Sequence, residues 1–165
     1  MKLASWGNIL IALQAAIAPA WAADDLSVER MATCQDSWLD WKKNDSAQLE
    51  KFGVDLRSNF SEGGNNGSLV PKTGTSIGGL RVVRMFPETV GMGVGFSVTV
   101  GASFAATRRS VETILGKSLA KCDASDNMRT CELEIGEKRT FMLMAEANAK
   151  SATTMLGCYY YYYEK

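Results

Sequence analysis

Apolar residues recur at steps of three and four in two segments near the N-terminus, a spacing that places them on one face of an α-helix. The first segment, Leu26 to Lys43, has its apolar stripe at Val28, Met31, Cys34, Trp38 and Trp41. The second has its stripe at Leu49, Phe52, Leu56 and Phe60, after an Asp45–Gln48 pair typical of a capping box. We therefore predict two N-terminal helices, the first of which carries the Cys34 thiol toward the core.

The chain from Ser61 to Gly79 is dominated by Gly, Ser, Asn and Thr. These residues are typical of turns and loops. We expect a long surface loop here, with Ser68 to Val70 as its one strand candidate and an edge hairpin as the form that this strand would take.

Beyond Gly79 the pattern changes to a period of two, which indicates strands with one buried face. Strands are predicted at 80–86, where Pro87 would end the strand, and at 90–100, 128–135, 139–146 and 153–165. In the second strand, one face has Met92, Val94, Phe96, Val98 and Val100, and the other has Gly91, Gly93, Gly95, Ser97 and Thr99.

One segment within this region returns to helical spacing. Between Ser103 and Gly116 the apolar stripe consists of Phe104, Val111, Ile114 and Leu115, and Gly116 is suited to end a helix. Short turns such as Gly136-Glu137 join the later strands, which must therefore run antiparallel. The sequence predicts an α+β domain, with N-terminal helices packed on an antiparallel sheet and one helix inserted among the strands.

The first 25 residues are typical of an export signal. Lys2 precedes an apolar stretch of about ten residues, too short to span a bilayer. Ala20-Trp21-Ala22 supplies the pattern that a signal peptidase needs, so we expect cleavage after Ala22, or after Ala23, and one domain over 23–165. The alternative is a buried helix of the domain, although Asp24 and Asp25 end the apolar stretch abruptly. Export would place the protein in the bacterial periplasm or outside the cell.

The four cysteines are an even number, which in an exported chain indicates two disulfides. Of the three possible pairings we favour Cys122–Cys131, which would close a short Asp-Ala-Ser-Asp-Asn turn, and Cys34–Cys158, which would join the first helix to the last strand. The alternative is one disulfide with two free buried thiols. A zinc site is disfavoured, because the chain has no histidine and no Cys-x-x-Cys pair.

All five tyrosines lie in one run directly after Cys158. Side chains alternate across a strand, so pairing of Cys158 with an inward Cys34 places Tyr160 and Tyr162 toward the core. The opposite, outer face then carries our four binding candidates, Tyr159, Tyr161, Tyr163 and Met155. From a neighbouring strand this face would receive either Met142 with Met144 or Phe141 with Leu143.

We expect the outer face to bind an unknown protein or glycan partner of the cell envelope, because tyrosines are enriched in interfaces. Four alternatives stay open. The chain's own loop or second helix would cover the face, a second copy would form a homodimer there, or the face would bind a small ligand. As the fourth alternative, the protein would be a structural subunit of a homo-oligomer.

Two chemical alternatives also stay open. Glu132 and Glu134 share a strand face, with their Cα atoms about 6.5–7 Å apart. Paired carboxylates at such separations hydrolyse glycosides. The enzymatic alternative is therefore a hydrolase that acts on a cell-envelope glycan. Met142 and Met144, with other methionines nearby, would offer thioethers to Cu(I). Core packing also accounts for methionines.

Composition excludes several classes of function. The 18 basic and 18 acidic residues balance, so no excess charge would drive binding to nucleic acid or to anionic lipid. Without histidine, Ser-His-Asp and Cys-His catalysis are excluded within this chain. We expect a non-catalytic binding protein with no cofactor and no bound metal.

Overall fold

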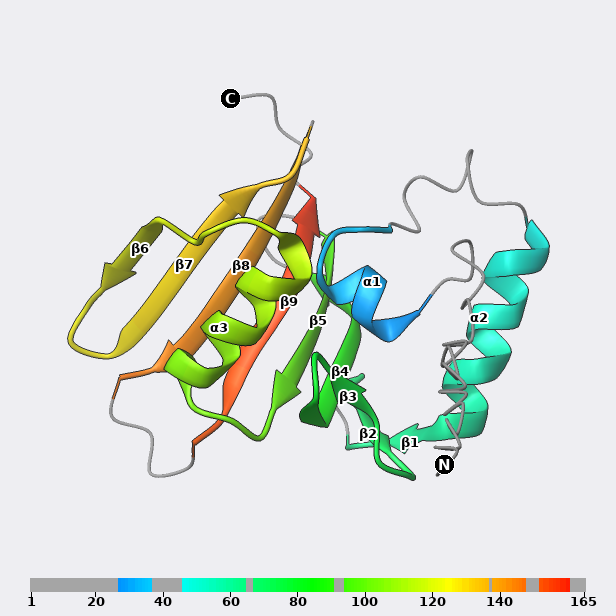
Figure 1. The fold of residues 1–165 in the computed structure, drawn as a ribbon. Helices are drawn as coiled ribbons and strands as arrows, with labels where there is room; N and C mark the ends of the chain where they lie inside the picture. Colours follow the sequence, from blue (N-terminus) through cyan, green and yellow to red (C-terminus); the bar gives the residue numbers. More distant parts are fainter. Residues whose placement is uncertain are drawn as a thin grey trace, which may run out of the picture.

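The computed structural model describes residues 27–36, 46–64, 67–90, 94–136, 138–147 and 152–160. Its helices are α1 (Val28–Ala32), α2 (Ser46–Asn59) and α3 (Phe104–Leu115). Its strands are β1 (Phe60–Glu62), β2 (Leu69–Pro71), β3 (Ser76–Ile77), β4 (Leu80–Val90), β5 (Val94–Val100), β6 (Lys121–Ala124), β7 (Met128–Glu134), β8 (Arg139–Glu146) and β9 (Thr154–Tyr160). The α+β prediction is confirmed, with α3 inserted between two strands (Figure 1). The expected export signal lies outside the described residues.

The described strands form an antiparallel sheet in the order β1-β2-β4-β5-β9-β8-β7-β6, and β3 pairs with the start of β4. The chain leaves β5 through α3, reaches the far edge at β6 and returns by successive hairpins to β9. Strand β9 therefore lies between β5 and β8, where it aligns Cys158 with Phe96 on one side and with Phe141 on the other. This register places residues far apart in the sequence side by side on one face.

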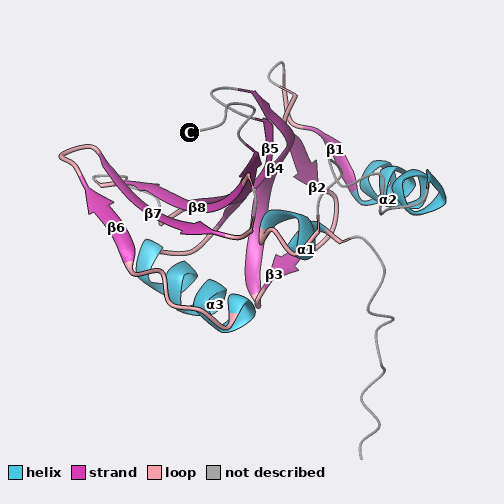
Figure 2. Ribbon diagram, turned by 90° about the horizontal axis from the view of Figure 1, so that it is seen from above, coloured by secondary structure: helices cyan, strands magenta, loops and turns pink. Residues whose placement is uncertain are grey.

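Helices α1 and α3 lie against one face of the sheet, called here the inner face (Figures 1 and 2). The central strands contribute these fully buried side chains to it: Phe96, Val98, Val100, Phe141, Leu143, Leu156 and Cys158. Met31 of α1 and Val111 of α3 are fully buried as well, and Phe52 of α2 packs against Phe96 with ring centroids 6.2 Å apart. Each large apolar side chain buried in this way contributes roughly 1.5–3 kcal/mol to stability.

Both predicted disulfides are present. Cys34–Cys158 joins the segment after α1 to β9, with a Cα–Cα distance of 5.0 Å across a sequence separation of 124 residues. Cys122–Cys131 joins opposite positions of the β6–β7 hairpin across a separation of nine residues. Among the described residues no cysteine is free, so the alternative with two thiols is wrong.

The predicted extent of the first helix is wrong, because α1 ends at Ala32 and Cys34 follows it with φ +60°. Its thiol side chain still points inward, and Cys34 is buried. Tertiary contacts hold the turn: Arg139 Nη1 donates to the Cys34 carbonyl at 3.3 Å, and the Tyr160 hydroxyl donates to the Asp36 carbonyl at 3.4 Å. Trp38 and Trp41 lie outside the described residues.

The segment 61–79 and the end of β4 also differ from the prediction. The expected hairpin is present as β1–β2, but β3 adds a second short strand, and Ile77 on it is fully buried. Strand β4 does not end at Pro87. Its pairing with β5 shifts register between Phe86 and Thr89, and such an irregularity accommodates a proline that has no N–H to donate.

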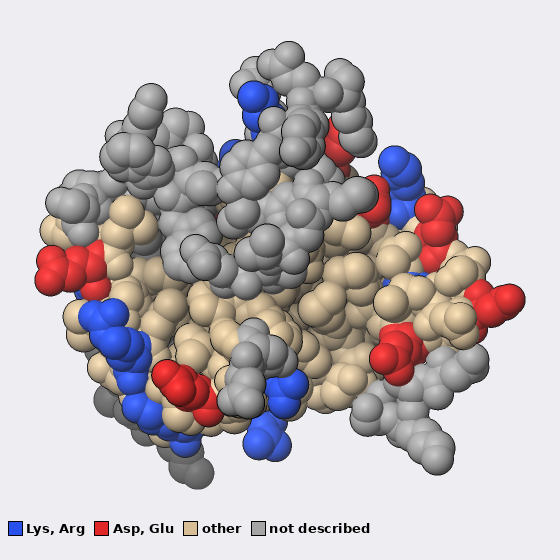
Figure 3. All heavy atoms as spheres, turned by 180° about the vertical axis from the view of Figure 1, so that it is seen from behind, with Lys and Arg blue, Asp and Glu red and all other residues tan. Residues whose placement is uncertain are grey.

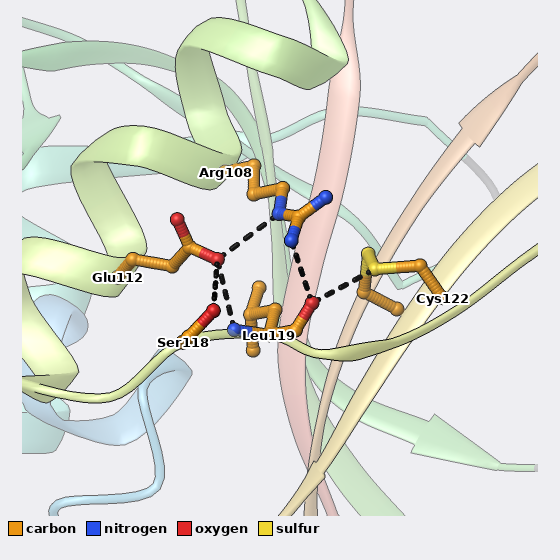
Figure 4. The surroundings of a disulfide bond; sticks show 6 residues. Arg108, Glu112, Ser118, Leu119 and Cys122 are labelled. Atoms are coloured by element: carbon orange, nitrogen blue, oxygen red, sulfur yellow. Dashed lines mark hydrogen bonds and ion pairs between the residues drawn. A yellow bond between two sulfur atoms is a disulfide. The ribbon is translucent and has the colours of Figure 1, made fainter.

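The inserted helix α3 follows the prediction and anchors the edge hairpin. Ser103 caps its N-terminus, and Gly116 ends it with φ +60°. Near its C-terminal end, Glu112 accepts hydrogen bonds from the Leu119 N–H at 2.8 Å and from Arg108 Nε at 3.0 Å, beside Cys122 (Figure 4). The hydrogen bond from Leu119 and then that from Arg108 lower the pKa of the Glu112 carboxyl below its usual value.

Candidate functional site

The outer face of the central strands is the side of the sheet opposite α1 and α3. Strand parity assigns to it Tyr159, Gly157 and Met155 of β9, Gly95, Ser97 and Thr99 of β5, and Thr140, Met142 and Met144 of β8. The predicted choice between two residue sets on β8 is thereby resolved in favour of Met142 with Met144, since Phe141 and Leu143 are buried on the inner face. Every side chain in this group is uncharged.

Tyr159 is the central aromatic residue of this face and is half-buried. Its partners across the strands are Gly95 on β5 and Thr140 on β8. A Cβ placed on Gly95 would lie only 2.7 Å from Tyr159 Cδ1, so the ring rests directly over the glycine. An aromatic ring over a glycine covers backbone that would otherwise be bare, and it fixes the orientation of the ring.

The structure tests only part of the tyrosine alternation. Tyr160 points to the inner face and is buried, as the sequence predicts, and its hydroxyl donates a hydrogen bond to the Asp36 carbonyl. Tyr161, Tyr162 and Tyr163 lie outside the described residues. Two of the four binding candidates, Tyr159 and Met155, are therefore placed on the predicted face, and the other two are not tested.

Charged side chains lie mainly toward the margins of this side of the molecule. Figure 3 views it from behind, and the described residues across its middle are uncharged. Neither of the chain segments that we considered as covers lies over the middle in its described part. Helix α2 packs through Phe52 on the inner side, and the described residues of 61–79 extend the sheet edge beside β4.

The two candidate catalytic glutamates lie on β7, at one side of the outer face. Glu132 is half-buried opposite Met142 and has Lys121 Nζ at 4.0 Å, while Glu134 is exposed opposite Thr140. Two surface hollows among the described residues lie elsewhere. One, of about 460 Å³, runs between α1, α2 and β3, and the other lies at the C-terminal end of α3. Neither hollow is lined by these glutamates.

We also searched the described residues for clusters of metal ligands and for membrane-spanning helices. Within the part of the chain that the structure describes, no cluster of three or more His, Cys, Asp or Glu residues is placed to hold a metal ion. In the same part, no helix has the length and apolar character needed to cross a membrane.

Sequence reasoning missed one member of the outer face. Met128 of β7 has the same parity as Thr130 and Glu132. Among the residues that the structure describes, it is one of two large apolar side chains that are exposed, with 40% of its surface accessible. The alternation of side chains within 128–134 contained this signal.

Comparison of the chain with protein-family models, with curated proteins and with solved structures finds no match.

Proposed function

We propose that this protein is an exported, non-catalytic binding protein whose partner contacts the outer face around Tyr159 and Met155. The observation that carries the proposal is the outer face of the central strands β5, β9 and β8, where the side chains assigned above are uncharged. Half-buried methionine and tyrosine side chains on such a face are typical of an interaction surface. A tyrosine ring contributes apolar contact area to such a surface.

Export is part of the proposal, and the two disulfides support it. Disulfides form and persist in oxidising compartments, such as the bacterial periplasm or the cell exterior. The signal-like pattern ending at Ala22 supports the same location. Analysis of the N-terminus of the protein recovered from cells tests this part: a chain beginning at Ala23 or Asp24 supports it, and an intact Met1 contradicts it.

The binding surface is tested by crosslinking capture from an exported-protein extract of the cells that make the protein. The native chain is compared with a variant carrying Tyr159→Ser, Tyr161→Ser and Tyr163→Ser, and with Tyr159→Ser alone. Val54→Ser is the matched control, because Val54 is an exposed apolar residue on α2, away from the outer face.

We expect a protein or glycan that is captured by the native chain and by Val54→Ser, but only weakly by either tyrosine variant. Equal capture by all four chains would overturn the proposal. Each chain is first shown to fold and to contain both disulfides, so that loss of capture reports on the surface.

A further inference from the structure

The methionines that the structure describes are divided between the two faces of the sheet. The inner side contains the fully buried Met31 and Met85, and the outer face contains Met128, Met142, Met144 and Met155. Methionine on an inner face is accounted for by packing. Met142, Met144 and Met155 are half-buried on the face opposite the hydrophobic core.

Three of the outer methionines lie close together because of strand register. Met144 and Met155 are directly opposite each other on β8 and β9. Directly opposed residues have Cβ atoms about 4.5–5.5 Å apart. Met142 lies two residues from Met144 on the same face, about 6.5–7 Å away along the strand. The three side chains therefore start from the corners of a small triangle.

The flexibility of the three side chains would allow their sulfur atoms to approach a common ligand. The residue opposite Met142 on β9 is Gly157, and Ser97 of β5 packs against this glycine, since a Cβ placed on Gly157 would lie 2.6 Å from Ser97 Cβ. Methionine is unbranched and has three rotatable bonds, so its sulfur adapts its position to a ligand. The Glu132 carboxylate, opposite Met142 on β7 and 4.0 Å from Lys121 Nζ, lies at the margin of the triangle.

Thioether sulfur is a soft ligand, which favours Cu(I) over hard cations such as Mg²⁺ or Ca²⁺. The usual competitors are missing from this chain, since it contains no histidine and its four cysteines are all in disulfides. We propose that Met142, Met144 and Met155 form a binding site for a soft monovalent metal ion, Cu(I), with Ag(I) as its redox-stable analogue. This site shares Met155 with the proposed partner surface, but it does not require that a partner exists.

The experiment is a titration of the folded protein with Ag(I), and with Cu(I) buffered by a competing chelator, while the methionine methyl groups are followed by NMR. The test variant carries Met142→Leu, Met144→Leu and Met155→Leu, because leucine has a similar volume and a shape change of this kind costs little stability. Met128→Leu is the matched control, since Met128 lies on the same face but opposite Glu146.

We expect a one-to-one complex in which the methyl signals of Met142, Met144 and Met155 shift together. Mutating residues that only support a metal ligand typically lowers metal affinity roughly 10–100-fold. Loss of any one of these three thioethers, which are ligands themselves, should lower the affinity for the metal ion at least as much. The triple variant should lose binding, and Met128→Leu should keep it.

Three outcomes would overturn the proposal. They are the absence of a one-to-one complex, equal affinity in the native chain and the triple variant, and an affinity that depends on Met128 instead. The spectrum of each variant without metal shows that it is folded. Because Tyr159→Ser leaves all three thioethers in place, its metal affinity separates this site from the proposed partner surface: metal binding should persist where partner capture is lost.

Discussion

The two faces of the central strands contain alternate residues of the same segments, yet they have different compositions and different consequences. On β8, Phe141 and Leu143 are fully buried under α1 and α3, while Met142 and Met144 lie half-buried on the opposite side. On β9, Cys158 binds Cys34 on the inner face, while Tyr159 covers Gly95 on the outer face. The inner face contains the hydrophobic core, and the outer face of the central strands contains uncharged residues that are half-buried or buried.

This comparison predicts that stability depends mainly on the inner face and on the disulfide that closes it. Replacing Cys34 and Cys158 together by alanine should give the largest loss. In the chain-entropy account, closing the 124-residue separation contributes about 5 kcal/mol, and the nine-residue separation of Cys122–Cys131 about 2.5 kcal/mol. Urea unfolding of the two double variants measures the difference.

The outcome that would contradict this prediction is a Cys122→Ala, Cys131→Ala variant that is as unstable as the Cys34→Ala, Cys158→Ala variant. That result would mean that the β6–β7 hairpin, at the sheet edge, limits stability as much as the centre does. Mass spectrometry of each variant verifies that the remaining disulfide is intact.

A second prediction compares adjacent residues of β8 that point to opposite faces. Leu143→Ala should cost roughly 2–5 kcal/mol, because it leaves a cavity in the fully buried core. Met144→Ala should cost roughly 1 kcal/mol, because its side chain is only half-buried and lies on the face opposite the hydrophobic core.

Thermal or urea unfolding of the two single variants decides this comparison. Equal losses would show that the outer face is packed as an interior, and would count against its role as a binding surface. Leu143→Met, which nearly conserves volume, is the control and should be close to the native chain.

The smallest expected effect concerns Glu112, which ties α3 to the segment that leads into β6. Because folding lowers the pKa of this carboxyl, its contribution to stability is complete above the usual pKa of 4.5 and is lost as the pH falls through the lower folded value. Glu112→Gln should therefore be less stable than the native chain near neutral pH and should approach it in acid.

Unfolding measured between neutral and acid pH checks this sign, with Thr113→Gln, an exposed neighbour on α3, as the control. The prediction is contradicted if the stability difference between Glu112→Gln and the native chain is the same at every pH. The difference would then come from the shape of the side chain and not from the charge of the carboxylate.

Much of the inner face was predictable from the sequence, because burial leaves a local pattern. The period of two in Phe96, Val98 and Val100 indicated a buried strand face, and Ser103 and Gly116 marked the ends of α3. The pairing of Cys122 with Cys131 followed from a short turn between two extended segments. These features depend on neighbours in the sequence, so local rules are sufficient.

The outer face was predictable only in part. Parity placed Tyr159 and Met155 on one side, but it gave no way to choose between Met142 with Met144 and Phe141 with Leu143. That choice depends on the register of β8 against β9, where Met144 is opposite Met155. A shift of one residue would exchange the two sets, and register is fixed by the buried face as a whole.

By itself, the sequence determined the α+β class, the inserted helix, the two disulfides and the period-two strands, because each is encoded by residues close together or by chemistry with few alternatives. Only the tertiary structure decided where α1 ends and how the outer face is composed. Cys34 adopts φ +60° where helical periodicity continued, since contacts with Cys158 and Arg139 come from more than a hundred residues away. Long-range contacts of this kind override local propensity, and they also brought three thioethers together on the outer face.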